Sequence, residues 1–157
     1  APLQAYNAFV KAKELDKNVE GYNMFSPDQA FPSLYGLLFV YGVDILIANN
    51  YTEAISIFEK ATYCYEFQKP TYPLYGELYY YYGYALEMTQ NPKATEIYEK
   101  AILDSTKNVN VFVRLIEQYK KDQNISKMEK LLLKAKTLMP NDPSIYVAEI
   151  DYNFQIL

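Results

Sequence analysis

The chain has 157 residues, half of them apolar, and a formal net charge of −4 with no histidine. It is long and apolar enough to bury a core, which excludes a disordered chain, and its acidity without a basic run argues against nucleic acid and anionic membranes as partners. The missing histidine removes the commonest general base and metal ligand, and the single cysteine, Cys64, has no disulfide partner within these residues.

Hydrophobic spacing and capping residues predict eight helices, joined mostly by short connections. Residues typical of helix N-caps mark three of the starts, at Asn50, Asn91 and Asp142. Proline follows two of these caps at the first helical position, where its missing N–H costs nothing. The predicted helices cover residues 2–16, 33–48, 51–67, 73–88, 92–104, 110–121, 124–138 and 143–157.

The most apolar stretch of the chain covers residues 34–48. It is shorter than the roughly 20 residues that cross a bilayer, and Asp44 interrupts it, so we expect a core helix and no membrane insertion. Before it, residues 18–32 contain Gly21 and two prolines, which predict a long insert with a single helical turn starting at Ser26. Cys64 lies among aromatic residues of a predicted helix and is expected to be buried.

Four of the predicted helices share one spacing, with a small residue or methionine, a large residue four positions later and an alanine three positions after that. Offsets of four and three lie on one face of a helix, and the small side chains let a neighbouring helix approach closely. The spacing therefore predicts equivalent tight helix crossings. The four copies are Ala5-Phe9-Ala12, Ala54-Phe58-Ala61, Ala94-Tyr98-Ala101 and Met128-Leu132-Ala135.

The copies recur in step with the helices that precede them. Gly42 precedes Ala54 by nearly the same distance as Gly83 precedes Ala94. This pattern resembles the tetratricopeptide repeat, an antiparallel pair of helices with a period of roughly 34 residues, and the interval from Ala101 to Ala135 fits that period. The third copy departs from the family pattern, with Ile116 where glycine is usual. The resemblance implies an all-α fold, a right-handed α-solenoid of antiparallel helix pairs.

The resemblance also implies one domain over residues 1–157. Its parts are an unpaired first helix, three repeats and a terminal helix, at 2–16, 33–67, 73–105, 109–140 and 143–157. The first helix matches the second helix of a repeat, and the last matches a first helix, so each leaves a face to cover. We expect either that the chain is a piece of a longer repeat array or that these ends stack on a partner or a second copy, through Ile150 and Phe154 at the C-terminal end. The alternative is that both helices are solvated caps.

A Lys-Glu-Leu-Asp exit from the first helix precedes the long insert and a tyrosine-rich repeat. This arrangement is similar to tetratricopeptide-repeat proteins of Bacteroidetes cell envelopes. The similarity favours a soluble protein of the bacterial periplasm or cell envelope.

The sequence does not indicate catalysis. Carboxylates such as Glu77 and Glu87 are scattered along helices, where solvated faces are a better interpretation than an acid–base pair. The sequence contains no glycine-rich phosphate loop, serine elbow or calcium loop. We expect no enzyme, no cofactor and no metal site.

The resemblance implies that the first helices of the repeats line a concave groove. Its first half is apolar and aromatic, which suits an extended or helical peptide with large apolar anchors. The alternative is that the insert at 18–32 or the packing between repeats covers these residues. The implied groove residues are Phe39, Val43 and Leu46 in the first repeat, Glu77, Tyr80, Tyr84 and Glu87 in the second, and Asn110, Val113, Glu117 and Lys120 in the third.

Two further sequence features bear on this groove. Tyr79 and Tyr82 fall at core positions, whereas Tyr80 and Tyr84 are four apart and point together into the groove. Some family members clamp the C-terminal carboxylate of heat-shock chaperones at fixed groove positions. Only Arg114 matches that set here, so it is a groove residue without that specialised role.

The sequence therefore predicts a non-catalytic scaffold that binds a protein or peptide through the groove. The first alternative is an assembly module that acts by end-to-end stacking of its terminal helices. The second is carbohydrate binding through exposed tyrosines, whose faces suit the apolar faces of sugars.

Overall fold

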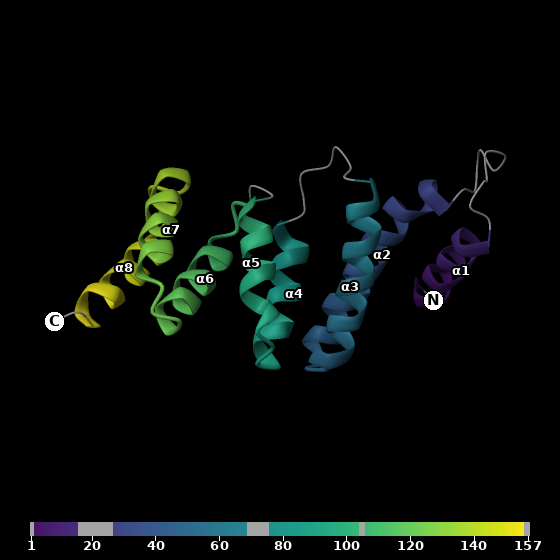
Figure 1. The fold of residues 1–157 in the computed structure, drawn as a ribbon, viewed down its shortest axis with the longest axis horizontal. Helices are drawn as coiled ribbons and strands as arrows, with labels where there is room; N and C mark the ends of the chain where they lie inside the picture. The colour runs from purple at the N-terminus through teal and green to yellow at the C-terminus, as the bar shows by residue number, and fades with distance from the viewer. Residues whose placement is uncertain (1, 16–26, 69–75, 104–105, 156–157) are drawn as a thin grey trace. The chain divides into compact units, whose positions relative to one another are not determined.

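The structure is a computed structural model that describes residues 2–15, 27–68, 76–103 and 106–155 (Figure 1). These residues form eight α-helices and no strand, which confirms the predicted all-α fold class. No helix in this part of the chain is long and apolar enough to cross a membrane.

The chain divides into two compact units, Ala1–Pro73 and Leu74–Leu157. Unit 1 contains α1 (Pro2–Leu15), α2 (Pro27–Ile47) and α3 (Tyr51–Gln68). Unit 2 contains α4 (Gly76–Met88), α5 (Lys93–Leu103), α6 (Val109–Lys121), α7 (Ile125–Leu138) and α8 (Pro143–Gln155). In unit 1, α2 packs against both α1 and α3. In unit 2, α4 packs against α5, and α6 packs against α5, α7 and α8.

Most helix boundaries agree with the prediction to within a few residues. The clear exception is α2, which begins at Pro27 instead of residue 33, because the turn predicted there continues into the helix. Proline is accepted at such a start, where the first N–H groups have no helical partner. Residues 18–26 of the predicted insert and the predicted chain break at 69–73 lie outside the described residues.

The same turn joins the two helices of each pair, α2–α3, α4–α5 and α6–α7. One residue in each turn has a left-handed backbone, and these residues are Asn49, Gln90 and Gln123, with φ of 61°, 55° and 54°. The next residue is always an asparagine, whose backbone N–H donates to the carbonyl five residues earlier; the asparagines are Asn50, Asn91 and Asn124, at 3.2, 2.9 and 2.8 Å. This is a Schellman-type helix end, and its threefold recurrence shows three equivalent helix pairs.

The asparagines also cap the helices that follow, as predicted for Asn50 and Asn91. Asn91 Oδ1 accepts the backbone N–H of Lys93 at 3.0 Å, and Asn124 Oδ1 accepts that of Lys127 at 3.3 Å. These bonds satisfy N–H groups that a helix start leaves without an internal partner.

The predicted crossings are buried in both units. Ala61, Ala101 and Ala135 are all 0% exposed. The large residues in two of these copies of the spacing, Phe58 and Tyr98, are 0% and 2% exposed. The three alanines are therefore fully buried, as the spacing predicts.

Two glycines explain how the aromatic residues fit into these crossings. A Cβ atom on Gly42 would lie 2.6 Å from Cε1 of Phe58, and one on Gly83 would lie 2.5 Å from Cε1 of Tyr98. Both distances are too short for real side-chain contacts. The ring of one helix therefore occupies the space that the glycine of its partner leaves open.

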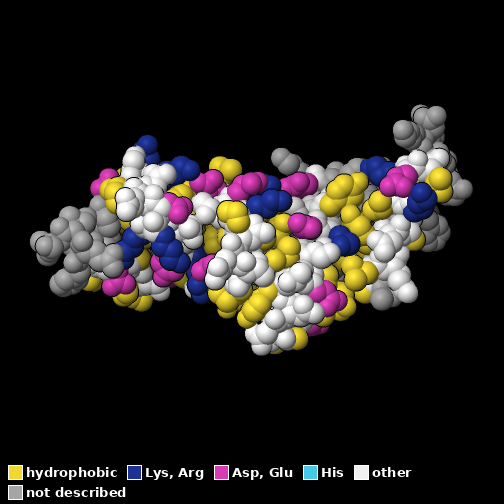
Figure 2. Space-filling model, turned by 60° about the horizontal axis from the view of Figure 1, so that its bottom comes forward, with side chains coloured by type: hydrophobic (Ala, Val, Ile, Leu, Met, Phe, Trp, Pro, Cys, Tyr) yellow, Lys and Arg dark blue, Asp and Glu magenta, His cyan; other side chains and the backbone are white. Residues whose placement is uncertain are grey.

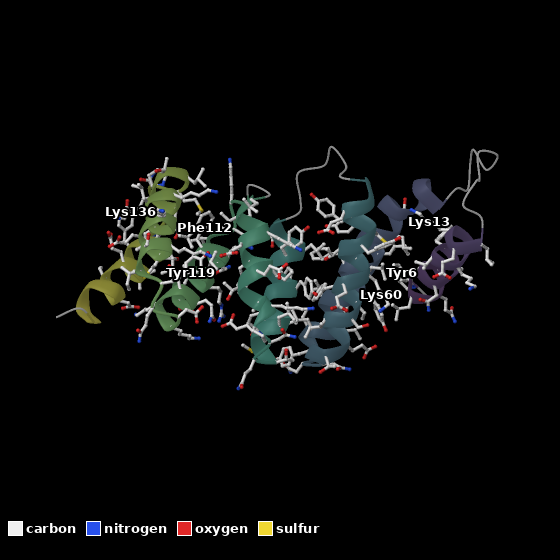
Figure 3. All side chains as sticks on the ribbon, viewed as in Figure 1. Tyr6, Lys13, Lys60, Phe112, Tyr119 and Lys136 are labelled. Carbon is white, nitrogen blue, oxygen red and sulfur yellow. The ribbon has the colours of Figure 1, made fainter. Side chains whose placement is uncertain are left out.

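The first copy of the spacing, Ala5-Phe9-Ala12, differs from the prediction. α1 packs against α2, and Tyr6 meets Tyr63 of α3 edge-on with the ring centres 6.2 Å apart (Figure 3). However, no side chain of α1 is fully buried, and Ala12 is exposed. Among the described residues, α1 thus touches its neighbours along one side only, so Ala12 does not form a tight crossing.

Unit 2 is held together by α6 and by contacts between α7 and α8. Phe112 and Tyr119 of α6 are buried at 0% and 7% exposure (Figure 3). Lys136 of α7 pairs with Glu149 of α8 and lies 5.6 Å from the ring centre of Tyr146. These contacts fix α8 against the rest of the unit.

Candidate binding surface

Side chains of α4 and α6 meet at two places in unit 2. Asn108, the N-cap of α6, donates through Nδ2 to both carboxylate oxygens of Glu77 at 3.0 and 3.1 Å. Further along both helices, Arg114 Nη1 pairs with Glu87 Oε1 at 3.1 Å, and its guanidinium carbon lies 5.3 Å from the ring centre of Tyr84. The tyrosine–arginine surface is our name for the face formed by Glu77, Tyr80, Tyr84, Glu87 and Arg114.

Glu87 connects this surface to the core. Its second oxygen, Oε2, accepts a hydrogen bond from the hydroxyl of buried Tyr98 at 2.9 Å. Burial and the neighbouring carboxylate raise the pKa of Tyr98, so the hydroxyl stays a donor. Burial disfavours the charge of Arg114, but the Glu87 carboxylate and the smaller effects of Tyr98, Glu117 and Tyr80 together outweigh it and raise the pKa of Arg114 above its ordinary value. The arginine is therefore held in place from beneath by a carboxylate that uses both of its oxygens.

The tyrosines of α4 divide between the core and the surface, as predicted. Tyr79 and Tyr82 are 4% and 5% exposed. Tyr80 and Tyr84 are half-buried and stack along the helix, with ring centres 6.5 Å apart and planes at 24°. Tyr81 meets Tyr80 edge-on at 5.1 Å, and burial raises the pKa of Tyr80. The surface tyrosines thus form one ordered aromatic cluster.

A cavity of about 360 Å³ lies between α6 and α8. Its walls combine apolar side chains with Glu117, Lys120 and Asp151 at the edge. Glu117 is one helical turn from Arg114 and helps to stabilise its charge. The cavity therefore continues the tyrosine–arginine surface along α6. Its lining residues are Val113, Ile116, Glu117, Lys120, Pro143, Ser144, Val147, Ala148 and Asp151.

Comparison with known proteins identifies the fold. No protein-family model and no curated protein matches the chain. The chain is similar in structure to YrrB, a TPR protein with an unusual peptide-binding site, with a TM-score of 0.55 and 21% sequence identity over 91% of this chain. The chain has a tetratricopeptide-repeat fold. It spans 63% of the length of the YrrB chain.

Within this tetratricopeptide-repeat fold, α4–α5 and α6–α7 are the helix pairs that the sequence predicts as two successive repeats, and α8 is the helix predicted as a further first helix. The predicted groove residues of unit 2 lie on the two first helices, α4 and α6. Of these residues, Tyr80, Tyr84, Glu87 and Arg114 come together at the tyrosine–arginine surface.

The groove residues predicted on α2 lie in unit 1. Phe39 and Val43 are half-buried, and Phe39 stacks on Tyr35 with ring centres 6.3 Å apart. Leu46 is 6% exposed. Its side chain therefore belongs to the core of unit 1 and does not line a groove, contrary to the prediction.

The residues predicted for end-stacking lie on α8. Ile150 is 51% exposed, and its neighbour Val147 is 56% exposed. Phe154 lies within the helix, but its side chain is outside the described residues. The described part of α8 thus presents apolar side chains to solvent.

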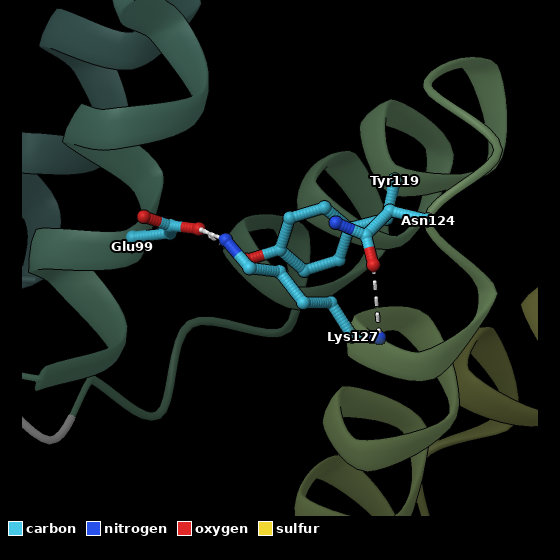
Figure 4. A network of polar contacts seen from close by, with 4 residues as sticks. All are labelled: Glu99, Tyr119, Asn124 and Lys127. Carbon is cyan, nitrogen blue, oxygen red and sulfur yellow. Dashed lines mark hydrogen bonds and ion pairs between the residues drawn. The ribbon is translucent and has the colours of Figure 1, made fainter.

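Two features were missed by the sequence analysis. One is the chain of contacts from Tyr98 through Glu87 to Arg114, which joins three helices, and no spacing rule relates residues on three helices. The other is a second carboxylate network on α5, where Glu99 Oε1 accepts from Tyr119 at 2.6 Å and from Lys127 at 2.8 Å (Figure 4). Among the described residues, no three metal-binding side chains come together.

Proposed function

We propose that this chain is a non-catalytic scaffold that binds a protein segment through the tyrosine–arginine surface and the adjoining cavity. The proposal depends on one observation, that Arg114 is held by Glu87 while it covers the Tyr84 ring. Tyrosine and arginine are among the residue types most enriched at energetically dominant interface positions. Because the contacts order these side chains before binding, little conformational entropy is lost when a partner binds.

The cavity between α6 and α8 sets the kind of segment that fits. Its apolar walls, including Val113 and Val147, would accept one large apolar side chain of the ligand. The charged groups Glu117 and Lys120 at its edge would pair with polar groups of the ligand backbone or flanking residues. A peptide with an apolar anchor matches both parts, and the peptide-binding site of the structurally similar YrrB supports the same class of ligand. Phe39 and Val43 remain predicted contacts on unit 1.

Peptides selected from a random display library on the whole chain would test the proposal. Binding of a labelled selected peptide is measured by fluorescence anisotropy for the wild type and for the double variant Tyr80→Ala, Tyr84→Ala. We expect at least a tenfold loss of affinity with unchanged helical circular dichroism. Tyr63→Ala, which removes a 42%-exposed tyrosine in unit 1, serves as the matched control. An unchanged affinity of the double variant would reject the assignment.

A second candidate function is self-assembly through α8, which the exposure of Val147 and Ile150 favours. Apolar side chains exposed along one helix are typical of surfaces that a partner covers. Light scattering over a range of concentrations would detect a dimer, and Ile150→Glu or Phe154→Glu should abolish it. A monomer at all concentrations argues against this candidate.

A further inference from the structure

A second groove lies on the other side of unit 2, between α5 and α7. It has a volume of about 340 Å³ and an apolar floor that includes Leu115 and Leu131, which are 1% and 7% exposed. Leu103 at its edge is 80% exposed. The lysine-rimmed groove is our name for this feature, which is lined by Glu99, Ile102, Leu103, Leu115, Tyr119, Lys127, Lys130, Leu131 and Lys134.

The rim of this groove is positive, although the chain as a whole is acidic. Three lysines line it against one carboxylate, and that carboxylate, Glu99, is already paired with Lys127 at 2.8 Å. Lys134 reaches across to the carbonyl of Ile102 at 3.3 Å. Lys130 makes no ion pair with any described residue and is exposed. On the face drawn in Figure 2, acidic and basic side chains are interspersed.

The three lysines follow one face of α7. Lys127, Lys130 and Lys134 are separated by three and four residues, which places them along one side of a helix over about 10 Å. Carboxylates spaced in the same way on a second helix would face all three lysines when that helix lies alongside α7. An apolar side chain on the same face of that helix would then enter the groove beside Leu103.

From the spacing of these lysines beside an apolar groove, we propose that the lysine-rimmed groove binds an acidic amphipathic helix of a partner protein. The ligand carries glutamate or aspartate at intervals of three and four residues, next to a row of leucine-like side chains. This surface and the tyrosine–arginine surface are separate, so the proposal does not depend on the proposed function. An anionic membrane is a poorer match, because three lysines on a chain with net charge −4 supply little attraction to a large charged surface.

A synthetic helix tests the proposal directly. The probe is a fluorescein-labelled peptide of leucine, alanine and glutamate, with leucine along one face and glutamate at intervals of three and four beside it. Its control has lysine in place of every glutamate. Anisotropy titrations use the whole chain. We expect the acidic probe to bind, to bind more weakly at high salt, and the lysine probe not to bind.

Variants locate the probe on the surface. Lys130→Glu with Lys134→Glu should weaken binding of the acidic probe by roughly tenfold or more, since each reversal turns attraction into repulsion. Leu103→Asp should weaken it as well, and because Leu103 is exposed the fold is retained. Lys93→Glu with Lys107→Glu is the matched control, because it makes the same change of net charge at positions outside the groove.

Several outcomes would overturn the proposal. Failure of the acidic probe to bind is one, and equal losses in the groove variant and the charge-matched control are another. Loss of binding in the Tyr80→Ala, Tyr84→Ala variant would place the probe on the other surface. Sedimentation of the chain with phosphatidylserine vesicles without peptide binding would indicate a lipid ligand. A dimer that disappears in the Lys130→Glu, Lys134→Glu variant would indicate a second copy as the occupant.

Discussion

Replacing Gly42 by alanine should destabilise unit 1, although alanine is the better helix former. In an open helical position the substitution gains about 1 kcal/mol. At Gly42 the new Cβ would lie 2.6 and 2.9 Å from two ring carbons of Phe58 and 3.2 Å from Cγ2 of Ile57. Phe58 is 0% exposed, so its ring has nowhere to move. Overpacking of this kind costs about 1–3 kcal/mol, and at the upper end of that range the net loss is about 2 kcal/mol.

The same helix supplies the control. Gly36 also lies within α2, but nothing lies within 4 Å of where its Cβ would be, and no glycine of the described residues has positive φ. Gly36→Ala should therefore stabilise the protein by about 1 kcal/mol. The two variants make the same chemical change in one helix, so intrinsic helix propensity cancels when they are compared.

Urea unfolding followed by helical circular dichroism measures both effects as midpoint changes. Gly42→Ala should unfold at lower urea and Gly36→Ala at higher urea than the wild type. Phe58→Leu removes the ring atoms in question, so in the double variant Gly42→Ala, Phe58→Leu the combined cost should be less than the sum of the single costs. Equal midpoints for Gly36→Ala and Gly42→Ala would refute the close-crossing explanation of this glycine.

Two further predictions concern titratable groups. Burial opposes the charge of Glu99, but hydrogen bonds from Lys127 and Tyr119 outweigh it and hold the pKa of Glu99 below its ordinary value of 4.5. Glu99→Gln should therefore lower the free energy of unfolding at pH 7. The loss should be less than about 1 kcal/mol, since the Glu99–Lys127 pair is partly exposed. That difference should decrease as the pH falls below 4.5, because the carboxyl takes up its proton first in the unfolded chain and, at a lower pH, in the folded one, and urea midpoints measured downward from pH 7 would show the decrease. A difference that does not decrease as the pH is lowered contradicts the assignment. Burial raises the pKa of the Cys64 thiol to about 12, so Ellman's reagent at pH 8 should react roughly a thousandfold more slowly with the folded chain than with the urea-unfolded chain. Equal rates would show that the thiol is accessible.

The repeat spacing predicted the fold because tight helix crossings require small residues at regular positions in the sequence. A crossing needs a small residue at one fixed place, and Ala61, Ala101 and Ala135 satisfy that need in each pair. The spacing wrongly predicted a tight crossing at Ala12, because a residue becomes buried only when another helix covers it. The spacing is present around residue 12, but among the described residues no helix covers Ala12.

The tyrosine–arginine surface was only partly predictable. Helical spacing correctly separated Tyr80 and Tyr84 from the core tyrosines, because that division depends on one helix alone. The same method placed Leu46 in the groove although it is buried, since residues near the end of a first helix can be covered by the second helix of the pair. The lysine row on α7 was not predicted from the sequence, and the apolar floor beside it comes from α5 and α6 as well as α7.

The two glycine crossings differ in a way that links packing to the binding surface. Phe58 fills the space at Gly42 with an apolar ring, whereas Tyr98 fills the space at Gly83 and donates its hydroxyl to Glu87 at 2.9 Å. Glu87 in turn holds Arg114, so the repeat core supports the orientation of the surface arginine.

Tyr98→Phe separates these two roles of the tyrosine, because it keeps the ring and removes only the hydroxyl. We expect a loss of about 1 kcal/mol in stability, the usual net value of one hydrogen bond. We also expect weaker binding of the selected peptide, because Glu87 loses one of the partners that hold it beneath Arg114. Phe58→Tyr is not a suitable comparison, because it adds a buried hydroxyl. The control is Glu87→Gln, which weakens the same contact with Arg114 by removing the carboxylate charge. If Tyr98→Phe lowers stability and leaves peptide affinity unchanged, the hydroxyl serves the core alone, and Arg114 is oriented by Tyr84 and Glu87 without it.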